Sequence, residues 1–192
     1  LVRERGRIMQ EAGERQPGTM AAVIGLDDPD VEEVCREAGA DICNLNSPGQ
    51  IVIGGTHTAV ARAMDLASAR GAAKVVALNV SGAFHSQLMQ PAVEGMKAAL
   101  AKVDLRDPEI PLVANCTASA LLTAQDVRDE LIAQVARAVQ WRKSVEYMVE
   151  SGVEKFIEIG PGKVLTGLIK RINRGPSLVN IGDADAVRLP SS

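Results

Sequence analysis

The sequence predicts an α/β fold made of a compact four-stranded unit and a second unit in which strands and helices alternate. Residues 18–80 show the order strand, helix, strand, strand, helix, strand, which is typical of ferredoxin-like folds. Residues 81–183 alternate helical periodicity with short apolar runs, a pattern that favours a parallel sheet. The composition is that of an ordinary globular chain, because 46% of the 192 residues are hydrophobic and 23% are charged.

A charged helix opens the chain, and the ferredoxin-like unit follows it. Residues 1–14 favour a helix, which Gln16-Pro17-Gly18 ends, and residues 20–24 read as a strand. Asp28-Pro29-Asp30 then begins a helix that runs to about Gly39, since Asp caps a helix and Pro suits its first turn.

Three strands and a second helix complete this unit. Residues 41–45 and 50–53 read as strands on either side of the tight turn Ser47-Pro48-Gly49. Thr56 caps a helix that ends near Gly71, and residues 74–80 form the fourth strand.

The rest of the chain alternates between the two kinds of element. The expected helices cover 86–103, 123–136, 141–151 and 163–173, and the expected strands cover 110–113, 155–159 and 177–181. We therefore divide the chain into a leading helix of a larger α/β unit, an inserted ferredoxin-like unit, the second part of the larger unit and a tail: residues 1–17, 18–80, 81–183 and 184–192.

Charge and composition exclude several classes of function. A net charge of -3 gives no electrostatic reason to expect nucleic acid or a membrane surface as partner. The apolar runs are too short to span a bilayer and no leader opens the chain, so a cytoplasmic protein is expected. Cys35, Cys43 and Cys116 show no metal-type spacing, and with two histidines no metal site is expected. We interpret the three cysteines as buried reduced thiols.

Two charged residues are candidates for chemistry. His85 lies at the predicted junction of a strand and a helix, where α/β proteins collect catalytic groups, and it suits a general base. The alternative is that His85 or Ser86 simply caps the helix. Arg5, beside Gly6, offers a planar guanidinium to a carboxylate, whereas the alternative is a solvated charge on a charged helix.

Two turns are weaker candidates. The amides in Asn44–Gln50 suit ligand binding, but they are also typical of any polar turn. Gly160-Pro161-Gly162-Lys163 precedes a helix, whose free N–H groups suit an anion; close packing of strand against helix is the alternative.

Six segments, taken together in this order, resemble those of a known family. They are Arg5–Gln10, Asn44–Gln50, Gly82–Ser86, Val139–Trp141, Ser144–Met148 and Glu158–Leu165. Together they resemble the bacterial malonyl-CoA:acyl-carrier-protein transacylases of type II fatty acid synthesis, over essentially all residues to about 181. The resemblance implies part of an α/β-hydrolase-like acyltransferase domain with an inserted ferredoxin-like subdomain.

The resemblance also implies a reaction and roles for particular residues. The implied reaction is a ping-pong transfer of malonyl from malonyl-CoA to the phosphopantetheine thiol of holo-acyl-carrier protein, without a cofactor. His85 corresponds to the general base, Arg5 to the arginine that binds the malonyl carboxylate, and Gln134 to the residue whose main-chain carbonyl orients the histidine. Asn46 and Gln50 fall in a loop that lines the cleft and are expected to bind substrate.

Phe84 corresponds to a position that goes with malonyl rather than methylmalonyl in related acyltransferases. A ring beside the α-carbon leaves little space for a methyl branch, and discrimination of this kind is worth about 1–3 kcal/mol.

The sequence contains no Gly-x-Ser-x-Gly motif, which would carry the nucleophile. Because the chain also begins without Met inside a predicted helix, we expect the N-terminal third of the enzyme to lie in a missing segment, and the chain alone to be inactive. Two alternatives remain: an acyltransferase domain of a polyketide synthase, and a non-catalytic fragment that binds carrier protein through basic residues near the C-terminal helix.

Overall fold

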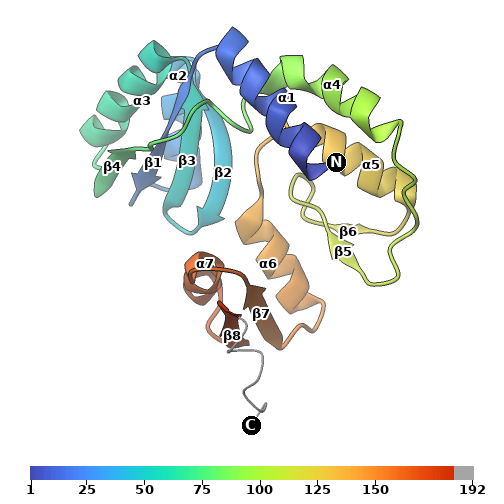
Figure 1. Cartoon of the computed structure of the whole chain (residues 1–192). Coiled ribbons are helices and arrows are strands. Elements are labelled where there is room, and N and C mark those ends of the chain that lie inside the picture. The colour runs from blue at the N-terminus through green and yellow to red at the C-terminus, as the bar shows by residue number, and fades with distance from the viewer. Residues whose placement is uncertain (184–192) are drawn as a thin grey trace.

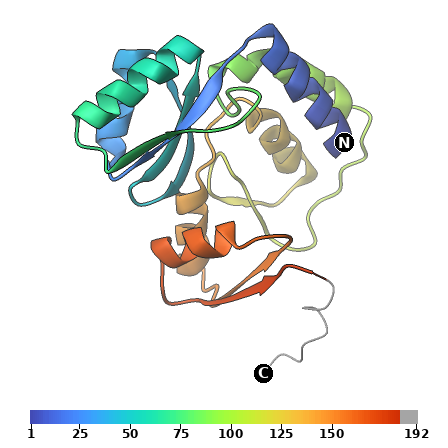
Figure 2. The same cartoon turned by 60° about the vertical axis from the view of Figure 1, so that its left-hand side comes forward.

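A computed structural model describes residues 1–183 as a chain of helices and strands in three groups (Figure 1). The four-stranded sheet with α2 and α3 stands on one side, and α1, α4 and α5 stand on the other. Helices α6 and α7 and the pair β7–β8 lie below both groups, as the turned view also shows (Figure 2). The predicted tail, 184–192, lies outside the described residues.

The four-stranded sheet has the spatial order β2-β3-β1-β4, and every neighbouring pair is antiparallel. Its strands are β1 (Thr19–Ile24), β2 (Asp41–Ser47), β3 (Gln50–Gly55) and β4 (Lys74–Ala77). The connecting helices α2 (Asp28–Ala38) and α3 (His57–Ala69) pack together on one face. The predicted order of strands and helices in residues 18–80 is confirmed.

The sheet buries one face against α2 and α3, and its other face packs against the segment that follows β4. Val23, Ile51 and Ile53 are fully buried against α2 and α3. Met20 and Val52 point to the opposite face, where they pack with Leu78 and Phe84. Side chains alternate between the faces of a strand, so the same strands serve a core and a second, partly open surface.

A second core joins the first helix to later parts of the chain. Helix α1 (Val2–Arg15) packs on α4 (Gln90–Leu100), and α4 contacts α5 (Ala124–Ala133). Their shared core is built from aliphatic side chains and methionine: Ile8, Met9, Ala12, Met89, Ala92, Met96, Leu100, Val135 and Ala136. Apolar residues three or four positions apart on α1 form the stripe that this contact needs.

The C-terminal elements form a small parallel pair. Helix α6 (Trp141–Glu150) leads to β7 (Lys155–Ile159), and α7 (Val164–Ile172) leads to β8 (Ser177–Ile181). Strands β7 and β8 pair in parallel, as expected for strands joined by a helix.

Other predicted elements differ from the structure. Residues 112–113 form β5 (Leu112–Val113), which pairs antiparallel with an unpredicted strand, β6 (Ala120–Leu121), and not with a parallel sheet. Strand β4 ends at Ala77, three residues early. The helix predicted from residue 86 begins as a 3-10 turn at Gln87 and becomes α-helical at Gln90, so His85 lies in an irregular segment.

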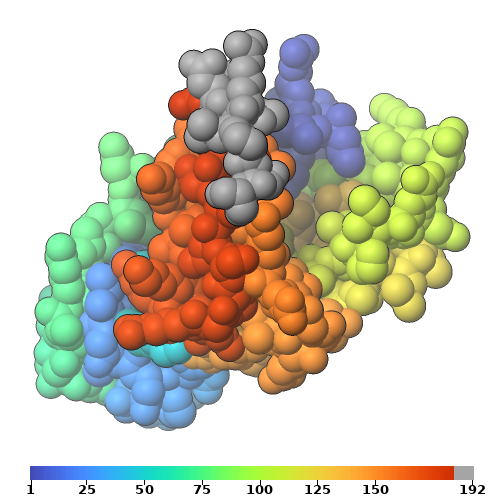
Figure 3. All heavy atoms as spheres, turned by 90° about the horizontal axis from the view of Figure 1, so that it is seen from below, coloured from blue at the N-terminus to red at the C-terminus, as the bar shows by residue number. Residues whose placement is uncertain are grey.

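Apolar side chains remain exposed on the C-terminal pair. Ile159 is 80% exposed and Val164 is 71% exposed, and Ile157 and Val179 are also open to solvent. Seen from below, the C-terminal segment, in orange to red, lies between the four-stranded unit and the segment that carries β5 and β6 (Figure 3). Large apolar side chains grouped in this way are typical of a surface that another segment covers.

The cysteines are free thiols, but only two of them are buried. Cys35 and Cys43 lie in the cores, whereas Cys116 is half-buried in a loop, so its predicted burial was wrong. Burial raises the pKa of Cys116 to about 12, which keeps the thiol protonated. Within residues 1–183 no helix is long and apolar enough to cross a bilayer, and no cluster of three metal-ligating side chains occurs.

Polar contacts join the four-stranded sheet and its helix α2 to residues 139–171. Val139 pairs in parallel with β2, donating to the Cys43 carbonyl at 2.8 Å while its own carbonyl accepts from Leu45 at 2.9 Å. Arg142 on α6 makes a two-pronged ion pair with Asp28, and Arg171 on α7 donates to Gln50. The Asp28–Arg142 pair is the most enclosed, with 26% and 16% of the side chains exposed.

We expect Asp28→Asn to lower the free energy of unfolding by about 1–2 kcal/mol, because it removes a charge-assisted pair at a partly buried position. Denaturant unfolding followed by circular dichroism measures this. Asp30→Asn is the matched control, since Asp30 lies in the same first helical turn but is exposed and makes no ion pair. Equal losses in the two variants would contradict the prediction.

Candidate active site

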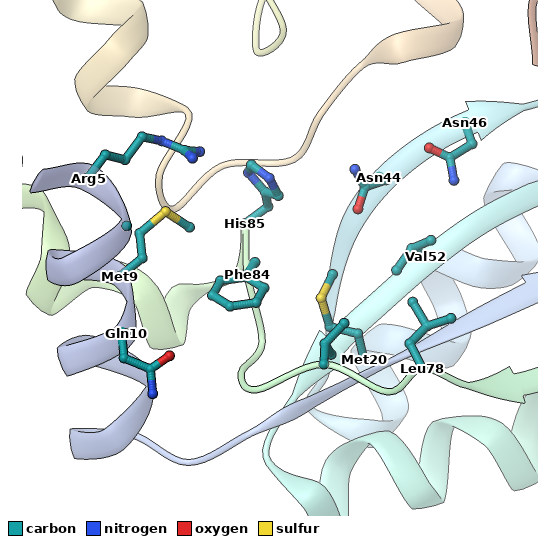
Figure 4. Close-up of a pocket in the computed structure, with 12 residues that line it drawn as sticks. Arg5, Met9, Gln10, Met20, Asn44, Asn46, Val52, Leu78, Phe84 and His85 are labelled. Atoms are coloured by element: carbon teal, nitrogen blue, oxygen red, sulfur yellow. The ribbon is translucent and has the colours of Figure 1, made fainter. Parts of the chain in front are cut away.

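A cleft of about 540 Å³ opens between α1, the open face of the four-stranded sheet and the segment that carries His85 (Figure 4). Its walls combine polar and apolar residues from distant parts of the sequence. The lining residues are Arg5, Gly6, Met9, Gln10, Met20, Asn44, Asn46, Val52, Leu78, Val80, Phe84 and His85.

The backbone holds His85 in a conformation that few residues adopt. Its φ of 61° lies in the left-handed region, which costs energy for any residue but glycine. Ser86 caps the 3-10 turn that follows, because its hydroxyl accepts a hydrogen bond from the N–H of Leu88. The same hydroxyl donates to the Ala83 carbonyl. The cap therefore belongs to Ser86, and the imidazole of His85 is free to serve the cleft.

The end of α5 orients the His85 ring. Nδ1 of His85 lies 2.6 Å from the main-chain oxygen of Gln134, the residue that caps α5. Carbonyls in the last turn of a helix have no partner within the helix, so this oxygen is available. Because a carbonyl only accepts, Nδ1 carries the proton and Nε2 keeps a free lone pair.

The surroundings of His85 favour its neutral form. Burial is the main cause that lowers its pKa, and the positive charge of Arg5 lowers it further. Hydrogen bonds to the main chain at Gln134 and Arg137 act in the opposite direction without reversing the shift. A neutral imidazole with an open Nε2 is the form that accepts a proton.

Arg5 keeps its charge available. Its Nη2 donates to the side-chain oxygen of Gln134 at 3.0 Å, and its Nε is buried without a partner. No carboxylate within residues 1–183 forms an ion pair with it, whereas Arg7 pairs with Glu4 and Glu11 on the same helix. Arg3 and Arg7 are thus the exposed charges near the start of this helix, and Arg5 is a partly buried guanidinium facing the cleft.

Gly6 and Phe84 shape the space beside Arg5. A side chain at residue 6 would meet no atom within 4 Å, so its absence leaves the cleft open there. The Phe84 ring packs against both the helical core and the open face of the sheet, which fixes its position next to His85.

The asparagines of β2 line the cleft, but Gln50 does not. Asn44 and Asn46 are two residues apart on one strand, so both face the cleft, and neither side chain has a partner in the structure of residues 1–183. Gln50 lies beyond the cleft, where its side-chain oxygen accepts from Arg171. The sequence offered Asn44 only as one of the amides in Asn44–Gln50 and assigned substrate binding to Asn46 and Gln50, although the spacing of two between the asparagines indicates that both face one side of the strand.

A carboxylate of the chain itself occupies the N-terminus of α7, after the glycine-rich turn. The Glu158 carboxylate accepts from the N–H of Leu165 at 3.1 Å and from that of Thr166 at 2.8 Å. These are the free donors that an external anion would need. An external anion is therefore not needed at residues 160–163. Close packing does not account for the two glycines either, because a Cβ added at Gly160 or Gly162 would meet no atom within 4 Å; their positive φ angles of 136° and 90° do.

The cleft offers a base and a cation but no nucleophile of its own. None of its lining residues is a serine, threonine or cysteine. An oriented neutral imidazole beside an uncompensated guanidinium and a narrow apolar wall suits transfer of an acyl group that carries a carboxylate, provided that a nucleophile reaches Nε2.

Residues 1–183 match the family model described as "Acyl transferase domain", and the chain belongs to this family. The malonyl CoA-acyl carrier protein transacylase of Bacillus subtilis is 39% identical over 193 residues, covering 98% of this chain and 61% of the relative. The enzyme of the same name from Escherichia coli K12 is 46% identical over 176 residues, covering 90% of this chain and 57% of the relative.

Solved structures give the same picture. An acyl-carrier-protein S-malonyltransferase from Bartonella henselae superimposes with a TM-score of 0.90 at 43% identity, over 96% of this chain and 60% of that one. A malonyl-transacylase in complex with a type II polyketide-synthase acyl-carrier protein gives 0.91 at 37% identity, over 95% and 60%. The chain thus has a mixed α/β acyltransferase fold, and it spans about 60% of the length of the relatives it matches.

We expect the pKa of His85 to lie below the ordinary histidine value, and Arg5→Met to raise it by removing a nearby positive charge. The raised pKa should still stay below the ordinary value, because burial is the larger cause. Proton NMR of the imidazole during a pH titration measures both, and His57→Gln leaves a single histidine to follow. The control is Arg3→Met, an exposed arginine on the same helix; an unchanged pKa in Arg5→Met would contradict the prediction.

Proposed function

We propose that this chain is part of a malonyl-CoA:acyl-carrier-protein transacylase that moves malonyl from coenzyme A to the phosphopantetheine thiol of holo-acyl-carrier protein in the cytosol. The observation that carries the proposal is that the cleft holds both an oriented His85 and an Arg5 that no carboxylate of residues 1–183 neutralises. The names of the curated relatives support it.

The proposed mechanism uses His85 as base and then as acid. Nε2 of His85 takes the proton of a serine hydroxyl, and the serine oxygen attacks the thioester carbonyl of malonyl-CoA. The C–S bond breaks, and the departing coenzyme A sulfur takes the proton from His85. In the second half the carrier-protein thiol gives its proton to Nε2 and its sulfur attacks the acyl-serine ester. The C–O bond to the serine breaks, and the departing serine oxygen takes the proton back from Nε2. Every bond broken is replaced, so no cofactor is needed.

Arg5 is proposed to hold the free carboxylate of the malonyl group. A guanidinium binds a carboxylate with two parallel hydrogen bonds, and partial burial strengthens them. Acetyl lacks the carboxylate, so it would leave the charge of Arg5 unpaired and bind less well.

Asn44 and Asn46 are proposed to bind the pantetheine arm shared by both substrates. Side chains two residues apart on a strand are about 7 Å from each other. The arm contains two amide groups separated by two methylenes, a comparable spacing that lets each asparagine reach one amide. Gln50 would then act farther out, at the mouth of the cleft, through its contact with Arg171.

A further segment of the enzyme is proposed to supply the serine and to cover the exposed apolar side chains of β7, β8 and α7. In this proposal residues 1–17 and 81–183 belong to one α/β-hydrolase-like unit. Residues 18–80 are a ferredoxin-like insertion, an interpretation supported by the β2-β3-β1-β4 order.

The two alternatives are less well supported. This chain covers 57–63% of its curated relatives, which are therefore too short to carry the other domains of a multifunctional synthase. A non-catalytic fragment that binds carrier protein would have no need of an oriented imidazole with a depressed pKa.

We expect His85→Ala to lower malonyl transfer by about 10²–10⁴-fold, because general base catalysis is lost. The assay uses the enzyme containing this chain together with the nucleophile segment, and intact mass spectrometry follows malonyl on the enzyme and on holo-acyl-carrier protein. His57→Ala is the control, since His57 is exposed at the start of α3. Transfer that survives His85→Ala would refute the proposed function, and so would the absence of a malonyl adduct on the unmodified enzyme.

We expect Phe84→Ala to raise the preference for methylmalonyl over malonyl by about tenfold, because the ring no longer excludes a methyl branch. Competition between the two coenzyme A esters, read by the mass of the acylated carrier protein, measures the ratio directly. The ring also packs in two clusters, so some loss of stability accompanies the change, but a ratio within one sample is insensitive to it. An unchanged ratio would show that Phe84 does not set the preference.

A further inference from the structure

We infer that the side chain of Gln134 is a specificity-determining positioning residue, which aims the guanidinium of Arg5 and thereby sets the preference for carboxylated acyl groups. The inference rests on the proposed function. It assigns to the side chain a role separate from that of the main-chain carbonyl of the same residue.

Two hydrogen bonds from one residue reach both functional groups of the cleft. The Gln134 main-chain oxygen lies 2.6 Å from Nδ1 of His85, and its side-chain oxygen accepts from Nη2 of Arg5 at 3.0 Å. Arg5 and Gln134 are 129 positions apart in the sequence, and α1 and α5 meet the same core. The end of α5 thus sets the distance between the carboxylate-binding group and the base.

The chemistry of the amide matters as much as its position. An amide oxygen is neutral, so it fixes one N–H group of Arg5 without cancelling the positive charge. Elsewhere on α1 the guanidinium of Arg7 is held by two carboxylates, those of Glu4 and Glu11, which offset its charge. A carboxylate at residue 134 would pair with Arg5 and compete with the malonyl carboxylate for it.

The remaining donors of Arg5 support this interpretation. Its Nε is buried without a partner, and a buried donor without a partner costs free energy until a ligand satisfies it. Arg5 lines the cleft, and Gly6 beside it leaves open space. With Nη2 held by Gln134, Arg5 lines the cleft with its other donors unoccupied by any side chain of residues 1–183.

The test compares malonyl-CoA and acetyl-CoA as donors for the enzyme containing the nucleophile segment, with Gln134→Met and Gln134→Glu. Methionine keeps the length and the main-chain carbonyl but removes the strong acceptor, whereas glutamate keeps the shape and adds a charge. We expect the malonyl-to-acetyl ratio of kcat/KM to fall about tenfold in Gln134→Met, as for loss of a hydrogen bond to a charged group. It should fall further in Gln134→Glu, mainly through a higher KM for malonyl-CoA.

Two controls separate this role from a structural one. Gln125→Glu makes the same chemical change on α5 at an exposed position where the side chain of Gln125 donates to Asp129, and it should leave the ratio unchanged. In an Arg5→Met background, Gln134→Met should change the ratio no further, because the glutamine acts through Arg5.

Equal losses for malonyl and acetyl, or an unchanged ratio, would overturn the inference while leaving the proposed function intact. An unmodified enzyme that transfers no malonyl would instead refute the proposed function, and the inference with it. If one of the two Gln134 variants fails to fold, the other still tests the inference. The malonyl-to-acetyl ratio is expected to fall in each of them for a different reason.

Discussion

The short segment from Gln134 to Arg142 is the constraint on which the rest of the site depends. At its start the Gln134 carbonyl orients His85, and at its middle Val139 adds a parallel bridge to the edge of the four-stranded sheet. The N–H of Gln140 donates to the Asn115 carbonyl at 2.7 Å, and Arg142 pairs with Asp28. One stretch of chain therefore fixes the imidazole of His85 relative to the sheet whose asparagines line the same cleft.

This arrangement explains why the cleft lies between two units and not inside one. The four-stranded sheet buries one face against its own helices, and its other face has no helix of its own. Arg5 comes from a helix that packs in a different core. Because each wall is rigid in its own core, the cleft can be lined by unpaired polar side chains without loss of structure.

The sequence predicted most elements, because capping residues and turns mark their ends locally. It failed where pairing depends on distant residues: β5 joins β6 through a turn around Ala118, with φ 53°, that no periodicity reveals. Among site residues, His85 and Arg5 were identified as candidates by their chemistry and by resemblance. The contact of Gln134 with Arg5 was not, since a hydrogen bond across 129 positions leaves no local pattern.

The site also shows how a neutral group can organise a charged one. A histidine that serves as base must stay unprotonated, and an arginine that binds a carboxylate must stay unpaired. Placing them near each other serves the histidine, because the charge of Arg5 lowers the pKa of His85. An acidic partner for either would undo this: on the imidazole it would raise the pKa, and on the guanidinium it would cancel the charge. The two oxygens of Gln134 contact both groups without a full negative charge. The hydrogen bond to the imidazole raises the pKa of His85 too little to reverse its lowering, and the hydrogen bond to Arg5 leaves the guanidinium charge uncancelled.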